Sequence, residues 1–354
     1  VCNWKSESRT LSMSNLMVLR IFIVIIIYYS AIALAQISLP TFQAVQNPVS
    51  VSGSALYDFT SHTFTNCSAT GSSGPTLSNC TSSYSTTWDD NTSYFNMNTQ
   101  GIQEWTVPKT GSYTIEAWGG EGGDNTASSS IPGKGARMKG TFSLTSGQVI
   151  KIIVGQKGST ARYIGGGGGG TFIWISGQTS APLIAAGGGG GVGYYATSYD
   201  DGINGTTAND GTNGNNQSSG AGTSGGGGTD VSGTSREASG GAGWLSNGND
   251  GSDHSCTYDS EGGVKPLSGG TGGSGGGSFS NGSPSGGFGG GGGGNARCGA
   301  VGGGGGGGYS GGGAGAEPPS FAGGGGGGSY NSGSNQSNSS GIQEDHGKVI
   351  ITLL

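Results

Sequence analysis

The sequence predicts an all-β protein, a β-sandwich interrupted by a long glycine-rich insertion. Short segments rich in β-branched and aromatic residues recur from residue 102 to residue 186, bounded by glycine or serine. No segment has a sustained helical period, and 78 of the 83 glycines follow Trp118, many in unbroken runs. Because another strand pattern closes the chain after about 150 glycine-rich residues, the simplest arrangement is a sandwich with an insertion.

The first 35 residues predict an export signal. A short segment from Met13 with Arg20 precedes the apolar run 21–34, and residues 33–35 match an A-x-A cleavage site. Residues 1–12 are expected to lie upstream of a start at Met13. The alternative is an uncleaved anchor, since residues 16–34 could just span a bilayer. We therefore expect a secreted protein, or one on the extracellular face of the plasma membrane.

The cysteines predict disulfides. Loss of the leader would remove Cys2 and leave Cys67, Cys80, Cys256 and Cys298. An even number in an exported chain favours disulfides, with three pairings open. We favour Cys67 with Cys80, which closes a short loop, and Cys256 with Cys298, which closes a longer one. A zinc site is not expected, because the chain has no CxxC and only three histidines.

Sequons for N-glycosylation are compatible with export. The chain contains eight N-x-S/T sequons, whereas its composition alone would produce about five, so the excess is slight. The candidate glycosylation sites are Asn66, Asn79, Asn91, Asn204, Asn216, Asn281, Asn335 and Asn338.

The folded domain is expected over residues 57–354, after a polar spacer at 36–56. Alternation of apolar and polar residues at 102–107 and 113–118, separated by Pro108-Lys109-Thr110-Gly111, predicts a hairpin. Further strands are predicted at 138–144, 149–154, 171–175, 182–186 and 347–354.

Residues 187–345 form the predicted insertion. The absence of a strict Gly-X-Y register excludes collagen, and a flexible linker is the plainer alternative. Aromatic residues beside the runs argue against a linker, namely Phe172, Phe288, Tyr309, Phe321 and Tyr330. We therefore expect extended threefold helices of the polyglycine II type, packed as a bundle in which each backbone N–H and C=O finds a partner on a neighbouring run.

Several ordered landmarks carry a family resemblance. Residues 64–67, 74–76, 101–108, 154–158, 183–187, 286–289, 308–312 and 346–349 resemble, in order, the glycine-rich extracellular region of the anaplastic lymphoma kinase and leukocyte tyrosine kinase receptors. The resemblance covers about residues 57–354. It implies a tumour-necrosis-factor-like sandwich of the jelly-roll type, bearing a bundle of polyglycine helices, in an ectodomain that binds cytokine ligands. The family's kinase domain would lie beyond Leu354.

No enzymatic activity is expected from this chain. It contains neither His-Arg-Asp nor Asp-Phe-Gly, and Gly133-Lys134-Gly135 lacks the Ser or Thr of a phosphate loop. No cofactor or metal is expected. The receptors of this family carry an acidic stretch after their GGY-x-GG landmark, where this chain has only Glu317 before two prolines. Glu317 is therefore a candidate for ligand binding, and the sequence assigns no other residue to the ligand contact.

Two functions follow from these patterns. The first is an extracellular module that binds a protein ligand, as in the ectodomain of a truncated receptor tyrosine kinase. The alternative is a secreted structural or adhesive matrix protein. Nucleic acid is not an expected partner, because the net charge of -6 is spread thinly without a basic run. A membrane would be involved only through a missing C-terminal span or an uncleaved N-terminal anchor.

Overall fold

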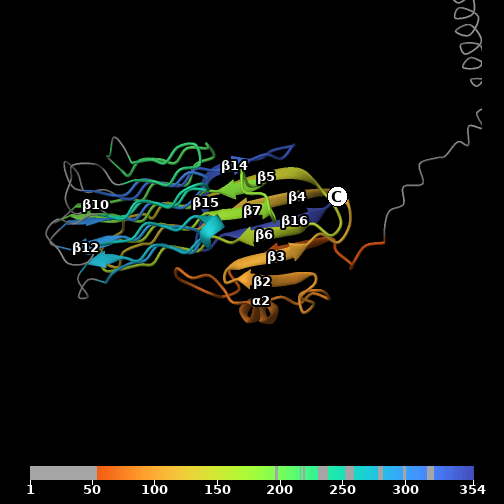
Figure 1. Cartoon of the computed structure of the whole chain (residues 1–354). Coiled ribbons are helices and arrows are strands. Elements are labelled where there is room, and N and C mark those ends of the chain that lie inside the picture. Colours follow the sequence, from red (N-terminus) through yellow and green to blue (C-terminus); the bar gives the residue numbers. More distant parts are fainter. Residues whose placement is uncertain are drawn as a thin grey trace, which may run out of the picture. The chain divides into compact units, whose positions relative to one another are not determined.

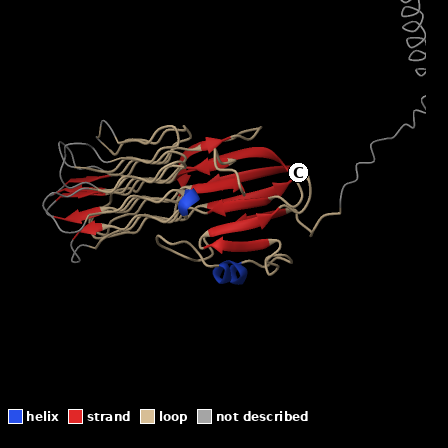
Figure 2. Ribbon diagram, viewed as in Figure 1, coloured by secondary structure: helices blue, strands red, loops and turns tan. Residues whose placement is uncertain are grey.

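The chain divides into residues Val1–Val51 and Ser52–Leu354, and the description concerns the second unit. The computed structural model describes residues 54–195, 198–215, 217, 220–229, 238–251, 259–277, 282–297, 300–316 and 323–354 (Figure 1). The predicted leader, and the predicted spacer as far as residue 53, lie outside these residues. Strands in mostly antiparallel sheets dominate the described part of the chain, which confirms the all-β class (Figure 2).

Two antiparallel sheets form the sandwich. The first sheet has the order β1 (Ser61–Phe64), β16 (Lys348–Leu353), β4 (Gly111–Trp118), β5 (Gly135–Leu144) and β15 (Ser339–Gln343). The second has the order β14 (Tyr330–Asn331), β8 (Ile184–Ala186), β7 (Thr171–Ile175), β6 (Val149–Ile153), β3 (Ile102–Thr106) and β2 (Phe95–Thr99).

Glycine-rich segments run from one end of the sandwich to a third, small sheet (Figure 1). That sheet has the order β10 (Ser198–Asp200), β9 (Gly193–Tyr195), β13 (Ala300–Gly302), β12 (Asn295–Arg297) and β11 (Gly276–Gly277). The described helices are short: α2 (Leu77–Ser83) and the single 3-10 turn η1 (Pro266–Ser268).

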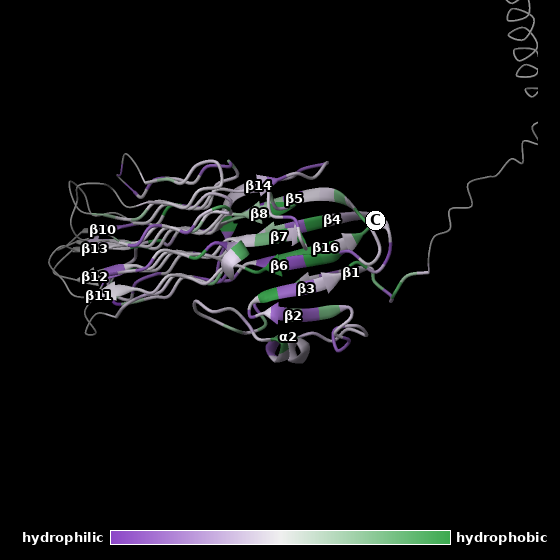
Figure 3. Cartoon of the chain, viewed as in Figure 1, coloured by the Kyte–Doolittle hydropathy of each residue, from purple (hydrophilic) through white to green (hydrophobic). Residues whose placement is uncertain are grey.

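The core lies between the two sandwich sheets and follows from period-two alternation. In β4, Tyr113, Ile115 and Ala117 are fully buried, whereas Glu116 between them faces outward. Trp105 enters the same core from the opposite sheet and is fully buried. Figure 3 shows the resulting contrast, with apolar residues concentrated in the sandwich strands.

The predicted hairpin at 102–118 is wrong, although both of its strands exist. β3 pairs with β2 and β6 in one sheet, whereas β4 pairs with β5 and β16 in the other. The turn at Pro108 therefore carries the chain across the core. Trp105 and Tyr113 meet inside it with ring centroids 5.9 Å apart. Alternation shows which face of a strand is buried, and two strands can bury those faces against each other from opposite sheets.

Several features of the sandwich were not predicted, strands β1 and β2 among them. Helix α2 is seven residues long, too short for a periodic pattern, and is set by a capping box in which Thr76 and Asn79 bond each other's backbone. Strands β14 and β15 lie inside the range 187–345 that was assigned to the insertion, yet they pair with β8 and β5 of the sandwich.

The glycine runs are ordered by hydrogen bonds that repeat every third residue. Along the run 165–170, successive N–H groups donate to three different segments before the first recurs. The donor–acceptor pairs are Gly165 to Val192, Gly166 to Ser159, Gly167 to Gly292, Gly168 to Gly189, Gly169 to Gln156 and Gly170 to Gly289. A period of three is expected for an extended helix with three residues per turn, whose groups point sideways to separate neighbours.

Three runs form the centre of the bundle, and each is bonded to the other two. Gly165 and Gly168 donate to the run 187–192, that run donates to 303–308 through Gly188 and Gly191, and Gly304 and Gly307 donate back to Gly165 and Gly168. The run 303–308 also accepts from the run 311–315 and from Gly292. Residues 239–242 and 325–328 accept N–H groups of residues 305–309. Six segments therefore surround this run.

The close approach of these backbones requires glycine. A Cβ added at Gly305 would lie 2.2 Å from the carbonyl oxygen of Gly312, and one at Gly167 would lie 1.9 Å from that of Gly305. Carbon and oxygen cannot approach so closely without repulsion. Ser239, Ala242 and Ser310 are buried in the bundle as well, so small side chains fit where the packing leaves room.

An ion cluster ties the bundle to β16. Lys157 Nζ lies 2.8 Å from Glu121 Oε2 and 3.4 Å from Asp345 Oδ1. Glu121 Oε2 also accepts the N–H of Asp345, and His346 Nδ1 accepts the N–H of Lys157. Burial alone would lower the pKa of Lys157, but the hydrogen bond and charge of Glu121, with help from Asp345, outweigh it and raise that pKa.

His62 is a neutral histidine in an aromatic cage. Its ring makes edge contacts with Phe64, Tyr84 and Trp88 at centroid distances of 4.6, 4.5 and 4.9 Å. Its Nε2 is buried and has no hydrogen-bond partner among the described residues. Burial lowers the pKa of His62 from 6.5 to about 4, and the charge of Asp89 only partly opposes this.

We predict that Gly305→Ala is severely destabilising and that Gly226→Ala is mild. A Cβ at Gly226 would find its nearest atom at 3.1 Å rather than 2.2 Å. The free energy of unfolding, measured by urea denaturation of the full chain, should fall by more than about 3 kcal/mol for Gly305→Ala and by less than about 1 kcal/mol for Gly226→Ala. Equal losses would contradict the packing described for the run 303–308.

We predict that His62 makes the protein less stable in mild acid. Because its pKa is lowered on folding, the unfolded chain binds the proton first as the pH falls, and stability is lost. Between about pH 7.5 and about pH 5 the loss due to His62 should be about 1–2 kcal/mol. His62→Phe should remove that part of the dependence in urea titrations, while His346, whose pKa burial also lowers, retains its own. An unchanged pH dependence in His62→Phe would be evidence against this assignment.

Candidate functional site

Turns of the bundle pack on the outer face of the second sheet. This face carries Ile153, Phe172 and Trp174, which form a second apolar cluster with Trp244 and Phe288 from the bundle. The indole N–H of Trp244 donates to the carbonyl of Thr179 at 2.9 Å. The sandwich and the bundle therefore meet through a buried aromatic contact.

A groove remains open where this contact ends. Its volume is about 410 Å³, and the 3-10 turn η1 forms one wall while β3, β6 and β7 form the floor. Its lining residues are Thr99, Ile102, Lys151, Trp174, Gly177, Thr179, Pro266, Leu267, Ser268 and Gly269.

Lys151 in the floor of the groove is paired with a buried carboxylate. Lys151 and Glu104 are cross-strand partners on β6 and β3, and Lys151 Nζ lies 3.1 Å from Glu104 Oε1. The carboxylate is buried and also accepts a hydrogen bond from the amide of Asn98, whereas Lys151 is about one quarter exposed. The groove thus combines an apolar surface at Ile102 and Leu267 with one accessible ammonium group.

This chemistry suits recognition of another molecule. Apolar walls with a few fixed polar groups are typical of binding sites. Among the described residues, no group of three or more His, Cys, Asp or Glu side chains could hold a metal ion. In the same part of the chain, no helix has both the length and the apolarity required to cross a bilayer.

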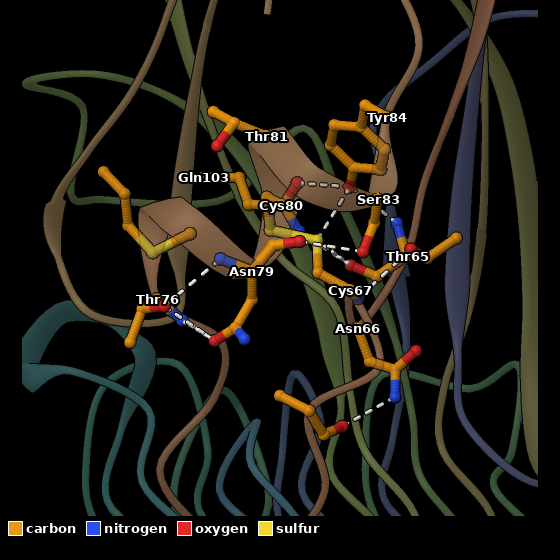
Figure 4. The surroundings of a disulfide bond; sticks show 12 residues. Thr65, Asn66, Cys67, Thr76, Asn79, Cys80, Thr81, Ser83, Tyr84 and Gln103 are labelled. Carbon is orange, nitrogen blue, oxygen red and sulfur yellow. Dashed lines mark hydrogen bonds between the residues drawn. A yellow bond between two sulfur atoms is a disulfide. The ribbon is translucent and has the colours of Figure 1, made fainter. Parts of the chain in front are cut away.

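The structure contains the predicted disulfide between Cys67 and Cys80 (Figure 4). The hydroxyl of Tyr84 beside it donates to Gln103 Oε1 at 2.7 Å and accepts the N–H of Thr65. Burial raises the pKa of Tyr84 to about 12, so the phenol remains a donor. The disulfide therefore joins the segment after β1 to α2, next to the buried side chain of Gln103 on β3.

Several predicted site residues lie outside the described residues. These are Cys256, Cys298, Glu317, Asn216 and Asn281. The second favoured disulfide and the ligand-contact candidate therefore stay predictions. Six sequon asparagines are described: Asn79, Asn91, Asn204, Asn335 and Asn338 are exposed, and Asn66 is half-buried.

The groove residues were not identified from sequence. Lys151 and Trp174 were placed in strands, but nothing in the alternation marks a position that faces a groove. Leu267 and Ser268 follow Pro266 within the insertion, and the proline is the one signal of a fixed turn there.

Comparison with known proteins gives one local similarity. No protein-family model matches the chain. Over 98 residues, 28% of this chain, it is 35% identical to the leukocyte tyrosine kinase receptor of Mus musculus. The matched stretch covers 11% of that receptor, so the chain spans a small part of this relative. The protein is thus loosely related to the leukocyte tyrosine kinase receptor.

Proposed function

We propose that this protein is an extracellular binding module whose partner is a protein ligand. The observation that carries the proposal is the 35% identity to the leukocyte tyrosine kinase receptor over 98 residues. The disulfide Cys67–Cys80 adds support, because disulfides persist in oxidising compartments outside the cytosol. Catalysis on this chain is not part of the proposal.

We assign the sandwich to the tumour-necrosis-factor-like, jelly-roll type and the glycine segments to the polyglycine II type. The two antiparallel sheets of five and six strands support the first assignment. The three-residue period of hydrogen bonds along 165–170 supports the second. In this view the bundle is a rigid support for the binding surface.

The groove between β3, β6, β7 and η1 is our candidate for the ligand contact. Its walls come from the sandwich and the bundle together, so both parts are needed to form it. An apolar side chain of the ligand would pack on Ile102 and Leu267, and a carbonyl or carboxylate would accept from Lys151. Because η1 is held by the bundle, little ordering would be required on binding, which favours affinity.

The alternative is a secreted matrix protein whose glycine bundle is the functional material. In the central run 303–308, the bonded N–H and C=O groups find their partners inside the same chain, which leaves few for pairing between molecules. This distribution favours a self-contained module over a material assembled from many chains.

We predict that the full chain, secreted and tagged, binds at least one secreted protein in a pairwise array. Ser268→Arg and Thr99→Arg, at exposed positions of the groove, should each weaken that binding by at least about tenfold, because the new side chains would occupy the groove. Surface plasmon resonance would measure the affinities.

Ser112→Arg is the matched control, since Ser112 is exposed on β4 in the other sheet. Binding that is unaffected by both groove variants would remove the groove from the proposal. Binding of no protein in the array, together with concentration-dependent self-association, would instead support the matrix alternative.

A further inference from the structure

The six described sequons differ in what holds the side-chain amide of the asparagine. In N-glycosylation a bond forms between the anomeric carbon of a lipid-linked oligosaccharide and Nδ2 of asparagine, a proton leaves Nδ2, and the lipid diphosphate departs. The sugar needs open space around Nδ2. The O and N atoms of an asparagine amide are told apart by their hydrogen bonds, so a backbone partner that can only donate or only accept fixes where Nδ2 lies.

Asn79 presents its Nδ2 to solvent. Its Oδ1 accepts both the N–H and the hydroxyl of Thr76, at 2.9 and 2.7 Å, as part of the cap of α2. Both partners are donors on one residue, so they hold Oδ1 inward and leave Nδ2 pointing away, as Figure 4 shows. The residue is exposed, and no hydrogen bond engages this Nδ2 within the described residues.

Asn91 has the same arrangement in the connection between α2 and β2. Its Oδ1 accepts the N–H of Ser93 at 3.0 Å, and the residue is exposed. Because a backbone N–H can be bonded only by the oxygen, Nδ2 again faces away from the chain.

In Asn66 and Asn204 the Nδ2 atom faces the protein rather than open solvent. Asn66 is half-buried, and its Nδ2 donates to the carbonyl of Ala69 at 2.6 Å. The Oδ1 of Asn204 accepts the N–H of Lys134 at 2.7 Å, which directs its Nδ2 toward Gly341. A single carbon added at Gly341 would lie 2.4 Å from this Nδ2, so no sugar fits between them.

We propose that Asn79 and Asn91 carry N-linked glycans in the folded protein and that Asn66 and Asn204 do not. The inference rests on the proposed extracellular location, because the transferase acts on exported chains. Asn66 and Asn79 make a matched pair, since each is followed by a cysteine of the same disulfide and then by Ser or Thr. Asn335 and Asn338 lie three residues apart on the connection between β14 and β15, and the proposal makes no statement about their glycosylation.

The two glycans would lie along one border of the sandwich. Asn79 belongs to α2 and Asn91 to the segment that leads into β2, the edge strand of the second sheet (Figure 1). An unpaired edge strand invites pairing with another chain. Bulky, solvated glycans beside β2 would oppose such pairing.

The test uses the full chain expressed in cultured animal cells, once with its own leader and once with a substitute secretion leader. Peptide mapping after enzymatic release of N-glycans, with heavy-oxygen labelling of each released site, reports occupancy at every asparagine. We expect occupancy at Asn79 and Asn91 in the secreted protein and none at Asn66 and Asn204. Thr81→Ala and Ser93→Ala should each remove one glycan from the secreted protein, whereas Ser68→Ala and Thr206→Ala should leave the number of its glycans unchanged.

The two leaders separate the failure of this inference from the failure of the proposed function. Occupancy at Asn79 and Asn91 with the substitute leader alone would support the site assignment and argue against export by the natural leader. With the substitute leader, glycans at Asn66 or Asn204, or bare Asn79 and Asn91, would overturn the assignment.

Discussion

The fold depends on backbones that approach one another without side chains between them. Three runs, 165–170, 187–192 and 303–308, bond each other in a closed triangle. Other segments attach around this triangle. A net contribution of about 1 kcal/mol per hydrogen bond is modest, and ordering a glycine costs about as much, so the bundle gains stability only when many bonds form together. A Cβ at Gly167 or Gly305 would collide with a neighbouring carbonyl, so the close packing of the runs is possible only with glycine at these positions.

The sandwich anchors this bundle at one end. The Glu121–Lys157–Asp345 cluster fixes the glycine segments to the start of β16, and Trp244 and Phe288 pack on the outer face of the second sheet. These contacts hold η1 against the strands and so create the groove. The candidate binding surface therefore exists only where the bundle packs against the second sheet.

Much of the fold follows from the sequence, and the reasons for the rest are specific. The strands β3 and β4 were predicted from alternation, and β5, β6, β7 and β16 were predicted from short segments rich in β-branched and aromatic residues. Pairing was not recoverable for β3 and β4, since consecutive strands on opposite sides of a core have the same alternation as a hairpin. The aromatic residues beside the runs, such as Phe288, correctly indicated order, because they pack where the bundle meets the sheet. The groove could not be predicted, because Trp174 and Leu267 are brought together only by the path of the bundle.

The triangle of runs also affects the order in which the protein can fold. Two of its members, 165–170 and 187–192, leave the ribosome well before 303–308 is made, yet they need that third run to complete their bonds. Synthesis proceeds at about 5–20 residues per second, so this wait lasts for seconds. Contacts between residues so distant in sequence also slow folding. During this interval the bonds of residues 165–170 and 187–192 to the third run cannot form, and β16 is made only after the bundle's final run.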